Sequence, residues 1–251
     1  MLPSQNTLLN MQNSSKPKAV FAWSGGKDSS YCLHQVLEEN KYEVVYLLTT
    51  LNFEFKRISM HGVKEELLDL QAESICIPQL KVWLYEASYS SYEQQMEEML
   101  LKAKAEGIEH VIFGDIFLED LREYREKTLQ KIGMKAVFPL WKKDTKNLIQ
   151  SFIEKGFKTL TCCVNDAFFD EHWVGKEIDK NFIHDLPNNV DPCGENGEYH
   201  TYCYAGPIFK KEINISIGEK IYRPLENQNL KAMNEDQKQT KGFWYCELNA
   251  K

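Results

Sequence analysis

The sequence has no cysteine pattern that would staple a fold or hold a metal. Its seven cysteines include no C-x-x-C pair and no zinc-type spacing. No apolar run approaches the length of a membrane span, and residues 1–17, rich in Asn, Gln and Ser, lack the basic start and apolar middle of a signal peptide. We therefore expect reduced thiols in a cytoplasmic protein with no membrane segment, and a disordered tail over residues 1–17.

Positive charge is also in short supply. The formal net charge is −7, which disfavours a dominant nucleic-acid surface, so we expect no nucleic-acid partner. The hydrophobic content of 43% supports a substantial core, and 27% charged residues indicate a solvated surface. A chain of 251 residues has room for one large domain or for a large and a small one.

Two widespread phosphate-binding patterns, G-x-x-x-x-G-K-[ST] and G-x-G-x-x-G, are absent as well. In their place stands Ser24-Gly25-Gly26-Lys27-Asp28-Ser29, between the apolar run 19–23 and a helical pattern that follows it. A strand, a Gly-rich turn and a helix N-terminus present backbone N–H groups to an anion. An ordinary turn is the alternative for a lone Gly-Gly pair, but the full six residues favour a phosphate site.

Each residue type in this loop has a role in that reading. Gly25 and Gly26 let the backbone approach a ligand, Ser24 and Ser29 add hydroxyl groups, and Lys27 adds a point charge. Asp28 is unfavourable beside a phosphate unless a divalent cation lies nearby, so we expect it to hold Mg²⁺. The loop resembles the PP-loop of the ATP pyrophosphatases, an adenine nucleotide alpha-hydrolase-like group that cuts ATP between its α and β phosphates.

The first part of the chain alternates strands and helices. Apolar runs at 44–51, 81–85 and 111–113 predict strands, and helical spacing predicts helices over 63–70, 92–107 and 118–132. This alternation predicts an α/β fold with a parallel sheet. Ligands bind at the carboxyl ends of such strands, so we expect Leu51, Gly114 and Asp115 to converge on the loop and to contact ATP.

The pattern changes near residue 137. A helix over 145–154 and strand-like runs at 159–164, 213–217 and 242–248 frame a long loop-rich stretch, and 226–241 is a polar excursion. We expect three parts: the tail 1–17, a PP-loop ATP-binding domain over 18–136, and a smaller α+β substrate domain over 137–251.

The loop-rich stretch contains a second concentration of chemistry, Gly194-Glu195-Asn196-Gly197-Glu198-Tyr199-His200-Thr201. Taken alone, it predicts a β-turn at Asn196-Gly197 with solvated charges. Together with the PP-loop, it resembles the Gly-Glu-Gly/Asn-Gly-Glu-Tyr/Phe signature of the diphthine–ammonia ligase family. The resemblance runs from about Lys18 to the last strand, with further landmarks at 61–63, 114–116 and 138–141.

The second motif departs from the form expected in eukaryotic and archaeal members. Asn196 stands where that form has Gly, and His200 stands where it has Glu, which resembles a bacterial-looking subgroup. Bacteria lack the diphthamide modification, so the family name does not fix the substrate of this protein.

The resemblance implies an ATP-dependent amidation. A carboxylate attacks the α-phosphorus, pyrophosphate leaves, and ammonia converts the acyl-adenylate to an amide. The loop 24–29 would grip the phosphates, and ATP and Mg²⁺ would be the cofactors. The expected catalytic residues are Lys27, Asp28, Glu195, Glu198 and His200. The expected substrate-binding residues are Glu195, Asn196, Gly197, Glu198 and Thr201.

Several alternatives stay open from the sequence. The acceptor is a small molecule, such as a cobalamin-pathway carboxylate, or an elongation factor 2-like protein, and free ammonia or a partner supplies the nitrogen. A PP-loop tRNA-modifying enzyme and a non-catalytic ATP-sensing module are the competing functions. Tyr124 and Arg125 match family positions, although a solvated helix face is the simpler reading. A homodimer is compatible with this class of fold.

Overall fold

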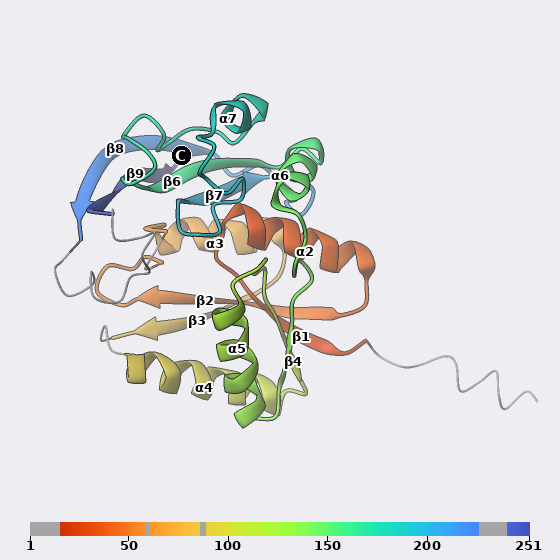
Figure 1. The fold of residues 1–251 in the computed structure, drawn as a ribbon. Helices are drawn as coiled ribbons and strands as arrows, with labels where there is room; N and C mark the ends of the chain where they lie inside the picture. Colours follow the sequence, from red (N-terminus) through yellow and green to blue (C-terminus); the bar gives the residue numbers. More distant parts are fainter. Residues whose placement is uncertain (1–15, 59–60, 86–88, 226–239) are drawn as a thin grey trace, which may run out of the picture.

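The computed structural model describes residues 16–58, 61–85, 89–225 and 240–251 (Figure 1). Residues 1–15 of the expected tail and residues 226–239 of the expected excursion lie outside that part of the chain. None of the helices in the described part has the length and apolar content that crossing a bilayer requires.

A parallel five-stranded sheet is built from the first half of the chain. Its strand order is β3-β2-β1-β4-β5, with every neighbouring pair parallel. The strands are β1 (Lys18–Ala22), β2 (Glu43–Asn52), β3 (Gln79–Leu84), β4 (His110–Ile112) and β5 (Lys135–Val137). The predicted α/β fold is therefore confirmed. The boundary expected between 136 and 137 falls inside β5, since Val137 still pairs with Ile112.

Helices cover both faces of this sheet, as its apolar strands require. They are α2 (Lys27–Glu39), α3 (Glu65–Ile75), α4 (Tyr89–Ala105) and α5 (Glu119–Lys131). Leu100 of α4 and Leu129 of α5 pack with Val20 and Leu48 on one face. Buried residues of α2 and α3, including Leu33 and Leu67, form the core on the other face.

A second, antiparallel sheet lies beyond α2 and α3, so these two helices are enclosed between the sheets (Figure 1). Its order is β7-β6-β9-β8, with β6 (Lys158–Asn165), β7 (Tyr199–Ala205), β8 (Ile215–Pro224) and β9 (Gly242–Ala250). Helices α6 (Thr145–Glu154) and α7 (Lys180–Asp185) accompany it.

Strand β7 is the element that the sequence did not predict. The sequence predicts a loop-rich stretch here, but β7 pairs with β6 along its length. The pattern is hard to read because both faces of β7 are covered: Tyr199, Thr201, Tyr202 and Cys203 are all buried, which removes the alternation of a half-exposed strand.

Buried hydrogen bonds join the two sheets across α3. Gln71, which is 0% exposed, donates from Nε2 to the carbonyl oxygens of Gly25 (2.9 Å) and Cys203 (2.6 Å). Its Oε1 accepts from Trp23 Nε1 at 3.0 Å. Tyr202 adds a bond from its hydroxyl to the Leu67 carbonyl at 2.9 Å. One amide of α3 thus links Trp23, directly after β1, the Gly-rich loop, and β7.

Replacing Gln71 with Leu should therefore be strongly destabilising, because Trp23 Nε1 and two carbonyl oxygens would lose buried partners. We expect a loss of about 3–5 kcal/mol in the free energy of unfolding, measured by urea denaturation. Gln150→Leu is the matched control, since Gln150 is exposed on α6 and its side-chain amide donates to the exposed Glu154. Its effect should stay within about 0.5 kcal/mol. Equal losses in the two variants would contradict the bridging role of Gln71.

Candidate functional site

The loop between β1 and α2 has the geometry of an anion site. Gly25 has φ +75°, and a Cβ there would meet Gln71 Oε1 at 2.6 Å, so both conformation and space demand glycine. Ser24 Oγ bonds Ser29 Oγ at 3.0 Å and accepts from Gly26 N at 3.3 Å. The N-cap of α2, Gly26, supplies no side-chain cap to the helix. The N-terminal end of the helix, with its partial positive charge, is thus presented at the loop.

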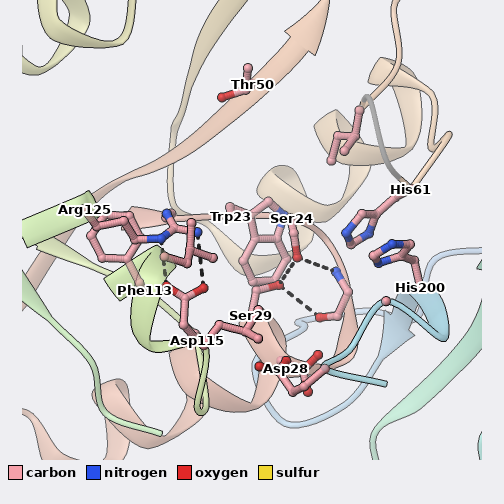
Figure 2. Close-up of a pocket in the computed structure, with 18 of the residues that line it drawn as sticks. Trp23, Ser24, Asp28, Ser29, Thr50, His61, Phe113, Asp115, Arg125 and His200 are labelled. Atoms are coloured by element: carbon pink, nitrogen blue, oxygen red, sulfur yellow. Dashed lines mark hydrogen bonds and ion pairs between the residues drawn. The ribbon is translucent and has the colours of Figure 1, made fainter. Parts of the chain in front are cut away.

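A cavity of about 1120 Å³ opens above this loop, bounded by both halves of the chain. Figure 2 shows Ser24, Ser29 and Trp23 near its centre, Arg125 and Phe113 on one side, and His61 and His200 on the other. The predicted site residues that line it are Ser24, Gly26, Asp28, Ser29, Gly114, Asp115, Glu195, Asn196, Gly197, Glu198, His200 and Thr201. The sequence-distant motifs are therefore brought to one place.

Leu51 does not reach the cavity. It is 0% exposed and belongs to the core on the α2 and α3 side of the sheet. Its neighbour Thr50, which points to the opposite face of β2, lines the cavity instead. Leu51 is therefore not a cavity residue, which corrects the expectation from the sequence. An apolar run that is buried on both sides gives no sign of which of its residues faces the cavity.

Lys27 also lies differently from the expectation of a phosphate-gripping side chain. It is 3% exposed, and its Nζ lies 2.6 Å from Asp28 Oδ2 and donates to the Cys193 carbonyl oxygen. The ring of Tyr199 lies 5.2 Å away. Burial lowers the pKa of Lys27, but Asp28 and the other neighbours outweigh that effect and hold the pKa above its ordinary value. Lys27 thus stays charged and fastens the loop to the segment before the second motif.

Within the second motif, Glu198 organises the turn. It is 1% exposed, and its carboxylate accepts from the backbone N–H groups of Asp191 and Asn196, both at 2.9 Å. The side-chain amide of Asn196 donates to the same carboxylate at 3.1 Å. These bonds occupy Glu198, so its geometry favours a positioning role over the predicted catalytic one.

Thr201 contacts the loop directly. Its Oγ1 accepts from the backbone N–H of Lys27 at 2.9 Å, which makes it a cap for the first turn of α2 supplied by β7. The sequence assigned Thr201 to substrate binding. The structure gives its hydroxyl a partner in the loop that would bind the phosphates.

Glu195 is the motif residue that faces the other carboxylates. Its Oε2 accepts from Ile116 N at 3.2 Å. Burial, followed by the charge of Asp28, raises the pKa of Glu195 to about 8. Burial raises the pKa of Asp28 and of Asp115 as well, while Lys27 and Arg125 act against it. Burial and the charge of Asp28 thus favour the protonated form of Glu195, in a site where three half-buried carboxyl groups, those of Asp28, Asp115 and Glu195, line one cavity.

The carboxyl groups of Asp28, Asp115 and Glu195 suit a cation that is bound jointly by the protein and by a ligand. Among the described residues, no group of three or more His, Cys, Asp and Glu side chains forms a metal site by itself. Mg²⁺ is commonly held by one or two carboxylates together with phosphate oxygens, and Asp28 lies beside the anion loop. The residues present therefore fit Mg²⁺ bound with a nucleotide.

Arg125 and Tyr124 belong to the cavity wall and not to a solvated helix face, which corrects the simpler reading of the sequence. Arg125 Nε lies 2.8 Å from Asp115 Oδ2, and its guanidinium lies 4.2 Å from the centre of the Phe113 ring (Figure 2). Tyr124 donates to Glu93 at 3.3 Å. The sequence indicates that both residues lie on a helix, but it does not indicate that they face the cavity.

His61 and His200 form the opposite wall. Their ring centres lie 4.6 Å apart at 25°, a stacked pair that joins the segment after β2 to β7 (Figure 2). Burial lowers the pKa of His61 to about 4, and burial together with His61 and Lys27 holds the pKa of His200 well below its usual value. Both rings are neutral at physiological pH. His61 was noted in the sequence only as a landmark without a role.

The neutral state of His61 makes stability depend on pH. Its pKa is 6.5 unfolded and about 4 folded, so the unfolded chain binds a proton first and stability falls as the pH drops from about 6.5 towards 4. We expect this residue to contribute a loss of about 2 kcal/mol between pH 7 and pH 5, measured by urea denaturation.

His61→Phe should flatten this pH dependence while keeping an aromatic ring against His200. His172→Phe is the control, because His172 is exposed and should leave the slope unchanged. A His61→Phe variant with the same slope as the unmodified chain would show that His61 is not held neutral.

Family models and known proteins match most of this chain. Residues 17–136 match the family model for the diphthamide synthase N-terminal domain, and residues 144–232 match that for the diphthamide synthase C-terminal domain. The diphthine–ammonia ligase of Bos taurus is 24% identical over 221 residues, which is 79% of this chain and 82% of the relative. The Homo sapiens protein of that name is 23% identical with the same coverage, and the Danio rerio protein is 26% identical over 79% of this chain and 86% of its own.

A solved structure of the U34-tRNA thiolase NcsA from Methanococcus maripaludis aligns with 55% of this chain and 56% of its own. It is 16% identical with a TM-score of 0.32, a likeness too weak to carry weight. The two family models, by contrast, fall in chain order on the parallel sheet and on the segment that holds the second motif. This chain belongs to the diphthine–ammonia ligase family.

Proposed function

We propose that this chain is an ATP-dependent ligase that adenylates a carboxylate and transfers ammonia to it, with release of AMP and pyrophosphate. The observation that carries the proposal is the single cavity onto which the anion loop, Asp28 and Glu195 all open. A reaction that joins a nucleotide to a second substrate needs both binding regions within one enclosed space.

The loop would bind the β and γ phosphates. Backbone N–H groups at the start of α2 and the hydroxyls of Ser24 and Ser29 supply the hydrogen bonds, and the helix dipole adds favourable charge. Asp28 would hold Mg²⁺, which offsets the charge of the phosphates when bound. Lys27 acts from behind the loop: its ion pair with Asp28 positions the carboxylate.

The base of ATP would lie on the side of Thr50, Phe113 and Arg125. This side offers the aromatic ring of Phe113 and apolar side chains from α4 and α5, such as Met96 and Leu121, which suit a flat heterocycle. Gly114 lies here too, and a Cβ there would meet the backbone of Asp28 and Ser29 at 3.4 Å. Because Thr50 lines this side of the cavity and Leu51 does not, the base would lie against Thr50.

Glu195 is the candidate to meet the acceptor. Burial raises the pKa of Glu195, and in its protonated form the carboxyl group can donate a hydrogen bond to the carboxylate of the substrate, which a second anion would repel. Asn196 and Gly197, in the same turn, would shape this side of the cavity, while Glu198 and Thr201 hold the turn and the loop in place.

The acceptor remains a choice between two classes. The relatives are named for diphthine, which makes an elongation factor 2-like protein one candidate for this chain. His200, in place of the expected Glu, favours the other class, a small-molecule carboxylate such as one from the cobalamin pathway. We place the reaction in the cytoplasm, with free ammonia or a partner as the nitrogen source.

The test is release of AMP and pyrophosphate from Mg-ATP and ammonium chloride in the presence of candidate carboxylate acceptors. Asp28→Asn should lower the acceptor-dependent rate at least about 100-fold, because it removes a charge that acts at the phosphates. Asp69→Asn is the matched control. Asp69 is an exposed residue of α3 that pairs with Lys81 of β3, so this variant should leave the rate unchanged.

The products decide between mechanisms. ADP and phosphate in place of AMP and pyrophosphate would contradict attack at the α-phosphorus. Tight ATP binding without product release from either acceptor class would contradict the ligase proposal and favour a nucleotide sensor.

A further inference from the structure

The stacked His61–His200 pair has two polar atoms without partners. His61 Nδ1 and His200 Nε2 are buried, and neither has a hydrogen-bond partner among the described residues. A buried polar atom left unpaired costs about 1–3 kcal/mol, and nearly all such atoms in folded proteins are satisfied. Two of them on one wall of one cavity are free to form hydrogen bonds with a small molecule that enters it.

The position of the pair narrows the choice of ligand. A Cβ on Gly26 would lie 3.4 Å from Cε1 of His61, so the ring lies next to the anion loop and only glycine leaves a gap between them. Figure 2 shows the pair on the far side of Ser24 and Trp23 from Arg125 and Phe113. A molecule at the pair therefore lies beside the phosphate end of the nucleotide and away from its base.

The charge of the cavity wall narrows the choice of ligand further. The cavity offers donors for anions at the start of α2 and the carboxyl group of Asp28 for a cation. The histidine wall carries no charge at neutral pH, since burial and the nearby Lys27 keep both rings unprotonated. Each neutral imidazole has one nitrogen that accepts a hydrogen bond. Such a wall suits a small, uncharged donor of N–H groups.

We propose that His61 and His200 bind the nitrogen nucleophile as neutral ammonia, through hydrogen bonds from ammonia to their unpartnered ring nitrogens. This inference rests on the proposed ligase function. The hydrogen bonds leave the lone pair of ammonia free to attack. A C–N bond then forms at the acyl carbon, the C–O bond to AMP breaks, and one proton passes to the solvent. Both histidines are binding residues in this scheme.

The first test needs no acceptor. The full chain labelled with ¹⁵N-histidine is titrated with ammonium chloride at pH 7 and pH 8.5 at constant ionic strength, and the ring nitrogens are followed by NMR. We expect His61 Nδ1 and His200 Nε2 to shift in a saturable way, with midpoints that agree when plotted against free ammonia. The exposed His172 should not shift and serves as the internal control.

Two results would overturn the proposal. Absence of a saturable shift would mean that ammonia does not bind there. Midpoints that follow total ammonium, or equal shifts with potassium chloride, would mean that the site takes a cation. Because this titration does not require the ligase reaction, failure of the proposed function would not obscure its result.

The second test separates the nucleophile from the acceptor. His200→Phe retains a flat ring beside His61 and removes the accepting nitrogen. With the acceptor that supports pyrophosphate release, the KM for ammonia should rise about tenfold, the effect of losing one hydrogen bond of about 1.4 kcal/mol. Acceptor-dependent exchange of labelled pyrophosphate into ATP should not change, because that step precedes ammonia. Equal loss of exchange and of amide formation would assign the pair to the acceptor and overturn the inference.

Discussion

The site depends on the hydrogen bonds by which β7 holds the anion loop. The backbone N–H of Cys203 donates to the Gly25 carbonyl at 2.8 Å, and Thr201 Oγ1 accepts from Lys27 N at 2.9 Å. Gln71 bonds the same Gly25 carbonyl from α3. A loop rich in glycine has many conformations to lose, and these contacts select one of them before any ligand arrives. The second sheet is therefore part of the proposed nucleotide site.

The attachment of β7 to the anion loop explains why the two sequence motifs line one cavity. Because β7 runs against the loop, the turn that precedes it places Glu195 opposite Asp28, and the strand itself places His200 beside His61. The cavity therefore has three regions of different charge: the Arg125–Asp115 ion pair on one side, the half-buried carboxyl groups of Asp28 and Glu195 near the start of α2, and the uncharged imidazole wall. Each region suits a different participant in a reaction between a nucleotide, a carboxylate and ammonia.

The sequence predicted those parts of the molecule that depend on local pattern. The loop 24–29, the parallel sheet and the helix at 145–154 follow from glycine placement, apolar periodicity and the order of elements. The sequence did not predict partners far apart in the chain. Lys27 and Thr201 were read as ligand-binding, but each is engaged by a residue more than 150 positions away. Such pairings carry no local signal.

His61 and Arg125 are two further residues whose long-range contacts the sequence does not predict. Both stood near residues that the motifs drew attention to, yet nothing in their neighbours in sequence indicates that His61 stacks on β7 or that Arg125 closes on Asp115. Strand β7 itself was missed because burial on both faces removed its alternation. Between the two sheets, contacts between residues far apart in the chain decide which polar side chains face the cavity.

The claim that β7 sets the shape of the anion loop is tested most directly by calorimetric titration of Mg-ATP into Thr201→Val and Thr201→Ser. Valine removes the acceptor for Lys27 N–H at nearly constant volume, whereas serine keeps it. The account predicts a Kd about tenfold higher for Thr201→Val and close to the unmodified value for Thr201→Ser. An unchanged Kd in a Thr201→Val protein with an unaltered near-ultraviolet circular dichroism spectrum would contradict it.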